Sequence, residues 1–264
     1  MVGTVLVFEG QGATTVPGEP PLDLTLLAPG AAQRAIVVHQ LGRARAYGSA
    51  DDAEPVVGVI GQSLGEITAL VVAGALGEDV ALELVRLRAE LPARLAPGSE
   101  WTMASMTRLP LDRAEAAAAG LDIWVVGRNA PADAIVVGVT ADFATFVERA
   151  GATPSTYRQL PVVAPYHTPA MGRVADAFAH AVDGMDVADP QLPVLTPTGP
   201  GEVRTAADAR RVLVRALTSP VAWADVLATG AARWPDARWR ECGPSCSLYR
   251  FVWKNGLKLD WADA

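Results

Sequence analysis

Residues 55–73, PVVGVIGQSLGEITALVVA, hold the pattern on which the expected fold depends. PVVGVI at 55–60 is a short apolar run that predicts a buried strand, and 64–73 has the apolar character of a helix. Between them, GQSLG at 61–65 matches G-x-S-x-G, a turn that presents a serine between a strand and a helix. Glycines suit such a tight turn because they lack a β-carbon. We therefore expect Ser63 to be a nucleophile, while a glycine-rich turn with a serine N-cap is the alternative.

Apolar runs outside this stretch continue an alternation of strands and helices. Residues 4–8 predict another buried strand, which stops at a glycine-rich turn. Residues 31–47 and 78–95 have helical character, whereas the four prolines between 13 and 30 predict a loop. Strands that alternate with helices predict an α/β domain.

From about Trp101 the pattern changes to strands and helices in the order βαββαβ. The expected elements of this part are, in order, 101–109, 111–119, 121–127, 134–139, 141–150 and 155–160. That order is the ferredoxin-like split arrangement. The sequence therefore predicts an α/β-hydrolase-like large subdomain, residues 1–100 and 164–264, that carries the nucleophile elbow. A ferredoxin-like small subdomain is expected as an insertion at 101–163.

The composition excludes several classes of protein. Of 264 residues, 50% are hydrophobic and 19% charged, which is typical of a globular chain. The net charge of −7 argues against nucleic-acid binding, and no apolar run is long enough for a membrane span. The N-terminus lacks the features of a signal peptide, so we expect a cytoplasmic protein. Cys242 and Cys246 are separated by Gly-Pro-Ser with no histidine nearby, and we expect neither a disulfide framework nor a metal site.

A serine nucleophile needs a base, and the chain has three histidines. His39 and His180 lie in helical patterns that are typical of surface or core-edge residues. His167 instead lies in PVVAPYHTPAM, 161–171, whose three prolines predict a rigid loop. Functional side chains often lie on loops that a rigid scaffold positions. His167 is therefore the candidate base.

Arg88 is unusual within the helix expected at 78–95. On an ideal helical wheel it falls inside the apolar arc that includes Leu84 and Leu91. A buried guanidinium without a partner is costly, so an anionic partner is expected. The partner is either an internal Asp or Glu or a bound carboxylate, which the planar guanidinium fits well.

A set of motifs in a fixed order resembles the malonyl-CoA:acyl-carrier-protein transacylase family, which includes the acyltransferase domains of polyketide and fatty-acid synthases. The resemblance covers nearly the whole chain. The motifs are FEGQG at 8–12, Gln33, GQSLGE at 61–66, Arg88, Asn129 in RNAPADAIVVGV, His167 in PYHTPAM, SPVAW at 219–223 and ECGP at 241–244.

This resemblance implies a ping-pong acyl transfer. Ser63, deprotonated by His167, is expected to attack an acyl-CoA thioester, and backbone N–H groups of Gln11 and Leu64 are expected to form the oxyanion hole. A backbone carbonyl near Ala216 is expected to orient the histidine in place of an acid. The phosphopantetheine thiol of an acyl carrier protein then takes the acyl group, so acyl-CoA and the carrier protein are the expected partners.

The resemblance also implies the substrate contacts. Arg88 is expected to pair with the free carboxylate of a malonyl-type group, and Gln62, Asn129 and Gln33 are further expected contacts. Tyr166 is similar to the Phe of malonyl-selective domains and favours malonyl. No cofactor or metal is expected, since the phosphopantetheine arm belongs to the carrier protein.

Four departures from the family pattern are visible. Glu9 stands where the family usually has Pro, Gln62 where it has His, Pro92 where it has Met, and Ser245 where it has Gly. The segment between the first two motifs is also shorter than usual. We expect a specialised member of polyketide-type secondary metabolism.

Other functions fit parts of the sequence. An acyl hydrolase on the same scaffold is the nearest alternative, and a carrier-protein-binding module without activity is another. An ordinary α/β-hydrolase esterase would place its histidine near the C-terminus, but a long stretch of chain follows His167.

We also expect a monomer with cations near the mouth of the active-site cleft, because carrier proteins are typically acidic. Arg43, Arg45, Arg250 and Lys254 are the candidates.

Overall fold

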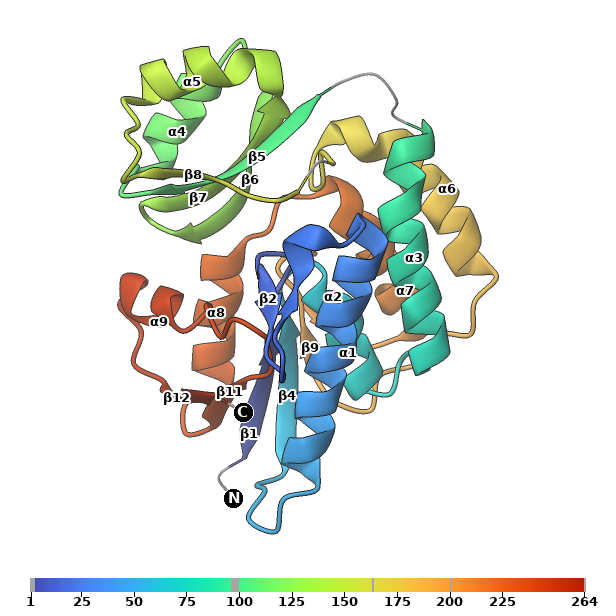
Figure 1. Ribbon diagram of the computed structural model, residues 1–264. Coiled ribbons are helices and arrows are strands. Elements are labelled where there is room, and N and C mark those ends of the chain that lie inside the picture. Colours follow the sequence, from blue (N-terminus) through green and yellow to red (C-terminus); the bar gives the residue numbers. More distant parts are fainter. Residues whose placement is uncertain (1–2, 96–99, 163, 200, 264) are drawn as a thin grey trace.

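Two sheets organise the part of the chain that the computed structural model describes, residues 3–95, 100–162, 164–199 and 201–263 (Figure 1). The larger has six strands, and all its neighbouring strands are parallel except the pair at one edge. Across the sheet they are β10 (Glu202–Val203), β9 (Val194–Leu195), β4 (Val56–Gly61), β1 (Thr4–Phe8), β11 (Arg238–Glu241) and β12 (Asp260–Asp263).

Helices cover both faces of this sheet (Figure 1). They are α1 (Pro29–Gly48), α2 (Gly65–Val72), α3 (Glu78–Leu95), α6 (Gly172–Asp183), α7 (Ala206–Thr218), α8 (Trp223–Arg233) and α9 (Arg250–Lys254). Leu6 and Phe8 of β1 pack in the core formed with α1, α2, α3, α6 and α7, whereas Val5 and Val7 pack with α8 and α9. Successive side chains of a strand point to opposite faces, so a strand covered on both faces is apolar throughout.

The four-stranded sheet is antiparallel and has the order β6-β7-β5-β8. Its elements are β5 (Trp101–Thr107), α4 (Leu111–Ala118), β6 (Ile123–Ala130), β7 (Asp133–Val139), α5 (Phe143–Ala150) and β8 (Tyr157–Gln159), with the short helix η2 (Thr140–Asp142) before α5. The predicted α/β class and the βαββαβ order are confirmed. The limits predicted for an inserted subdomain stay a prediction, and position 163 lies outside the described residues.

One face of the small sheet packs against helices α4 and α5, and the other face lines the site. Ala104 and Met106 of β5 pack in the core beneath α4 and α5. Met103 and Ser105, which point the other way, line a cleft toward the large sheet. Figure 1 shows the small sheet beyond the end at which β1 finishes.

The expectation of a plain loop at 13–30 was wrong. This segment contains the paired strands β2 (Thr15–Val16) and β3 (Leu22–Asp23) and the short helix η1 (Leu24–Leu26). The side chain of Asp23 caps η1 by accepting a hydrogen bond of 2.8 Å from the N–H of Thr25. Elements of two or three residues are too short to produce a hydrophobic period.

A third short helix, η3 (Pro169–Met171), follows His167. Within the described ranges, no helix has the length and apolar character needed to cross a bilayer.

Candidate active site

Ser63 lies on a strained turn between β4 and α2. Its φ is 55°, in the left-handed region that few residues other than glycine adopt. The flanking glycines permit the turn: a Cβ on Gly61 would lie 2.3 Å from the carbonyl oxygen of Gly65, and one on Gly65 would lie 2.3 Å from that of Phe8. The strand, the turn and the helix therefore meet as the G-x-S-x-G motif requires.

His167 is the partner of Ser63. Its Nε2 lies 2.7 Å from Ser63 Oγ, although the two residues are 104 positions apart in the sequence. Burial, together with the positive charge of Arg88, lowers the pKa of His167 to about 3. The imidazole is therefore neutral at physiological pH and can accept a proton.

The carbonyl that orients His167 is not at Ala216, as expected, but at Ser219. The Nδ1 of His167 lies 3.1 Å from the carbonyl oxygen of Ser219. Because α7 ends at Thr218, the carbonyl of Ser219 lies just past the helix and is available to the ring. The N–H of His167 donates to the carbonyl of Leu217 at 2.7 Å, so the end of α7 holds both the backbone and the ring.

Arg88 lies on α3 and is only 4% exposed, which confirms its predicted burial. Its guanidinium donates to Gln33 Oε1 at 2.7 Å, to Gln11 Oε1 at 3.4 Å and to Ser63 Oγ at 3.3 Å. All three acceptors are neutral. The Arg88 guanidinium has no Asp or Glu within ion-pair distance among the described residues.

Glu66 is the carboxyl group that, when ionised, would interact electrostatically with Arg88. It is fully buried, and its oxygens accept hydrogen bonds of 2.8–2.9 Å from the hydroxyls of Thr196 and Thr198. Burial raises the pKa of Glu66 to about 8. Glu66 is thus mostly protonated at neutral pH and does not cancel the charge of Arg88.

Tyr166 and Gln33 hold Arg88 in place. The Arg88 guanidinium carbon lies 4.0 Å from the centroid of the Tyr166 ring, a cation–π contact. The Tyr166 hydroxyl donates to the carbonyl of Arg88 at 2.8 Å and accepts from Gln33 Nε2 at 3.3 Å. Gln33 thus contacts both Arg88 and Tyr166 but is not among the residues that line the cleft, whereas Tyr166 lines it.

The backbone N–H groups of Gln11 and Leu64 flank Ser63. Neither donates a hydrogen bond to any residue that the structure describes. Leu64 is the N-cap of α2, where the helix dipole favours negative charge. The two groups are therefore free to bind an anion that develops at Ser63.

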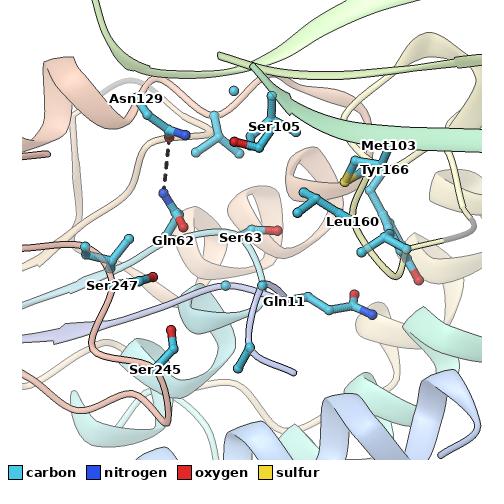
Figure 2. Close-up of a pocket in the computed structure, with 18 of the residues that line it drawn as sticks. Gln11, Gln62, Ser63, Met103, Ser105, Asn129, Leu160, Tyr166, Ser245 and Ser247 are labelled. Atoms are coloured by element: carbon cyan, nitrogen blue, oxygen red, sulfur yellow. Dashed lines mark hydrogen bonds between the residues drawn. The ribbon is translucent and has the colours of Figure 1, made fainter. Parts of the chain in front are cut away.

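These groups meet at a cleft of about 310 Å³ between the two sheets. Its lining includes seven of the residues that the sequence singles out: Gln11, Gln62, Ser63, Arg88, Asn129, Tyr166 and His167. Gln62 Nε2 donates to Asn129 Oδ1 at 3.3 Å and joins the two sides of the cleft (Figure 2).

Sequence reasoning missed several lining residues. Met103 and Leu160 form an apolar wall, and Ser247 lies on the opposite side of the cleft (Figure 2). The period of two along β5 would have grouped Met103 with Ser105, but no sequence signal indicated which face of the strand meets the cleft.

The chain matches the family described as the acyl transferase domain over residues 30–237. It is 28% identical over 226 residues to the malonyl CoA-acyl carrier protein transacylase of Mycolicibacterium smegmatis, covering 85% of this chain and 75% of that protein. It is 32% identical over 158 residues to polyketide synthase GfsA of Streptomyces halstedii, covering 58% of this chain and 2% of the synthase.

Solved structures are also similar. One is described as a type II PKS acyl-carrier protein in complex with its malonyl-transacylase; it has a TM-score of 0.89, 22% identity, and coverage of 99% of this chain and 96% of that one. At this identity the likeness shows the fold alone.

Proposed function

This chain belongs to the acyl transferase domain family, and from that premise we propose that it moves a malonyl-type acyl group from coenzyme A to the phosphopantetheine thiol of an acyl carrier protein. The match to this family, with transacylases among the relatives, confirms the resemblance predicted from the ordered motifs. The substrate assignment depends on one observation, which is the buried guanidinium of Arg88 beside Ser63 with neutral acceptors only.

In the proposed first half-reaction, Ser63 Oγ attacks the thioester carbonyl while His167 Nε2 takes its proton. The C–S bond breaks, and the departing CoA thiolate takes that proton from His167. In the second half-reaction the carrier-protein thiol gives its proton to His167 and attacks the acyl-serine ester. The ester C–O bond breaks, and Ser63 Oγ takes that proton from His167, which restores both residues. The distance of 2.7 Å between Oγ and Nε2 and the neutral state of the ring support these roles.

The tetrahedral intermediate carries its negative charge on the former carbonyl oxygen. We assign that oxygen to the N–H groups of Gln11 and Leu64, which have no other partner among the described residues. Such preorganised donors are worth about 3–4 kcal/mol each in related acyl-transfer sites.

Arg88 supplies the selectivity in this proposal. A substrate carboxylate would replace the weak contact between Arg88 and Gln11 with a charge-assisted bidentate pair. A neutral acetyl group offers no such partner and leaves the guanidinium buried without an anion. We therefore assign a dicarboxylic acyl group, and the bulk of Tyr166 favours malonyl.

We place the carrier protein at Arg158 of β8 and Arg250 of α9. Both side chains are exposed and line the cleft, Arg158 from the small sheet and Arg250 from a helix that packs on the large sheet. Neither forms an ion pair with a described residue. They are therefore free to attract an acidic partner whose phosphopantetheine arm must enter this cleft.

The other cations proposed from the sequence are engaged elsewhere. Arg43 lines a separate hollow, Arg45 pairs with Glu78 at 3.2 Å, and Lys254 pairs with Asp133 at 2.6 Å. We do not retain them in the docking surface.

The similarity to a Streptomyces halstedii polyketide synthase supports a role in polyketide-type metabolism.

Intact-mass analysis tests the proposal. After incubation with malonyl-CoA, the wild type is expected to gain the mass of one malonyl group and to pass it to a phosphopantetheinylated carrier protein. Ser63→Ala is expected to gain nothing, whereas Ser49→Ala, at the end of α1, should load normally. Loading of Ser63→Ala would refute the assignment of the nucleophile, and release of malonate to water in place of transfer would favour the hydrolase.

A further inference from the structure

Glu9 follows β1 directly and carries a buried carboxylate that the proposed reaction does not use. It is 2% exposed. Its Oε1 accepts the N–H of Ser245 at 2.7 Å, and its Oε2 accepts the hydroxyls of Ser245 and Ser247, the latter at 3.3 Å. Burial raises the pKa of Glu9, while these hydrogen bonds favour its charged form. The carboxylate thus accepts three hydrogen bonds, all from neutral donors.

The surrounding backbone is shaped around this carboxylate. A Cβ on Gly243 would lie 2.5 Å from the Glu9 carboxyl carbon, so any larger residue there would have to displace the Glu9 carboxylate. Cys246, between the two serines, has a left-handed φ of 44°. The carbonyl of Glu9 accepts a hydrogen bond of 2.7 Å from Gln40 Nε2, so the backbone of Glu9 is held as well. We call residues 243–248 the rim loop.

Two departures from the family pattern meet at this point. Glu9 replaces the usual Pro and Ser245 the usual Gly, and the two residues are hydrogen bonded although 236 positions separate them. Proline offers no side-chain acceptor and glycine no hydroxyl. The carboxylate and the hydroxyl that it binds are therefore a coupled feature of this chain.

Glu9 determines which hydrogen bonds the two serines can make in the cleft. A hydroxyl has one proton, and both Ser245 and Ser247 give theirs to Glu9. Toward the cleft, which both serines line, they present only acceptor lone pairs. Figure 2 shows them on the side of Gln62, across from Leu160. The rim loop therefore suits a ligand that brings neutral N–H donors.

We propose that Glu9, Ser245 and Ser247 form a subsite that accepts hydrogen bonds from the amide N–H groups of the pantetheine arm. This inference rests on the proposed function, in which the arm of both coenzyme A and the carrier protein passes through the cleft to reach Ser63. The arm carries two amides, and the exposed position of Ser245 at the rim places the subsite on that route.

The test compares two acyl donors, malonyl-pantetheine and an amide-free malonyl thioester of butanethiol. Both carry the same acyl group. The kcat/KM for loading from malonyl-pantetheine divided by that from the butyl thioester therefore isolates the contribution of the arm. In the double variant Ser245→Gly/Ser247→Ala, this ratio is expected to fall about fivefold for each hydroxyl removed. Loading from the butyl thioester should fall less than loading from malonyl-pantetheine, because the butyl group has no amide N–H to lose a partner.

Glu9→Gln provides a second test that keeps both serines. The amide is the same size but has one acceptor oxygen, so the hydroxyls are no longer fixed as acceptors toward the cleft. The ratio should fall in the same direction. Ser49→Ala, which removes a hydroxyl that donates one hydrogen bond to the carbonyl of Arg45, is the matched control and should leave the ratio unchanged.

Two results would overturn the subsite. One is an unchanged ratio in the double variant with its melting temperature preserved. The other is an equal loss on both donors, which would assign the serines a structural role. If the wild type loaded malonyl from neither donor, the proposed function itself would fail and the subsite with it.

Discussion

Two buried charged residues lie at opposite ends of the cleft, Arg88 in its lining and Glu9 behind the rim loop, and their surroundings differ. At the inner end, Arg88 contacts three neutral acceptors and has no anion within ion-pair distance among the described residues. At the rim, Glu9 accepts three hydrogen bonds from Ser245 and Ser247. The Arg88 guanidinium therefore lacks an opposite charge, whereas the Glu9 carboxylate has three hydrogen-bond donors beside it.

This difference assigns different tasks to the two residues. A buried charge without an opposite charge gains most from a ligand that supplies one, so Arg88 is suited to bind substrate. A carboxylate that accepts three hydrogen bonds from one loop instead orients those donors, so Glu9 is suited to position the rim loop. Variants in the cleft and at its rim test this contrast.

Removal of the base His167 should have the largest effect, because every acyl transfer in the cleft begins with attack by Ser63. His167→Ala is expected to slow acyl loading at least about 10³-fold, since Ser63 then lacks a proton acceptor. Single-turnover loading from malonyl-CoA measures this rate. His39→Ala, on α1, is the matched control and should load normally; an equal loss in both variants would contradict the assignment.

Charge reversal at the rim should separate the outer end of the cleft from the inner end. The double variant Arg158→Glu/Arg250→Glu is expected to lower transfer to the carrier protein about tenfold or more at low salt, with a smaller loss at high salt. Loading from malonyl-pantetheine, which lacks the charged nucleotide of coenzyme A, should be retained. Transfer at the wild-type rate would exclude this docking surface.

The protonation state of Glu66 decides whether Arg88 has an anion near it at neutral pH. Its pKa is 4.5 in the unfolded chain and about 8 in the native protein, so between these values the native state binds more protons. The free energy of unfolding should therefore fall as the pH rises through this window, by up to about 1.4 kcal/mol per pH unit.

The pH dependence of the free energy of unfolding is best compared between pH 6.5 and 8. His167, with a pKa lowered from 6.5 to about 3, changes stability in the opposite sense only below that range. Urea unfolding of wild type and Glu66→Gln at both ends of the range should show the slope in the wild type alone. The same slope in both proteins would show that Glu66 is ionised and faces Arg88 as an anion.

The smallest effect is expected from Tyr166→Phe. This change keeps the cation–π contact with Arg88 but removes two hydrogen bonds of the hydroxyl, one of 2.8 Å to the carbonyl of Arg88 and a longer one of 3.3 Å from Gln33 Nε2. The free energy of unfolding should fall by about 1 kcal/mol, as measured by urea denaturation, and the preference for malonyl should remain. Loss of that preference would mean that the hydroxyl contacts the substrate directly.

Much of the fold could be predicted because its signals are local. The apolar run 4–8 coincides with β1, and the helical period 78–95 coincides with α3. The burial of Arg88 also followed from that period. The pairing of Ser63 with His167 was different, because no periodicity relates residues 104 positions apart; it was indicated by the loop position of His167 among three histidines and by the order of the motifs.

The errors arose where three-dimensional position decides the outcome. The carbonyl expected near Ala216 came from the resemblance alone, and the structure places it three residues later at Ser219, just past the end of α7, where it is available to the ring. On α1, Gln33 contacts Arg88, but Arg43 is roughly 15 Å farther along the helix axis and lines another hollow. The departures at Glu9 and Ser245 were visible singly, whereas their contact was not.

The central claim is that Arg88 binds a substrate carboxylate, and competition between malonyl-CoA and acetyl-CoA for Ser63 tests it most directly. Intact-mass analysis at equal concentrations should show malonyl loading on the wild type at least about 100-fold faster, because acetyl leaves the guanidinium without an anion. Arg88→Ala should lose this preference and still load acetyl. Equal loading of the two acyl groups by the wild type would contradict the account and return Arg88 to a structural role.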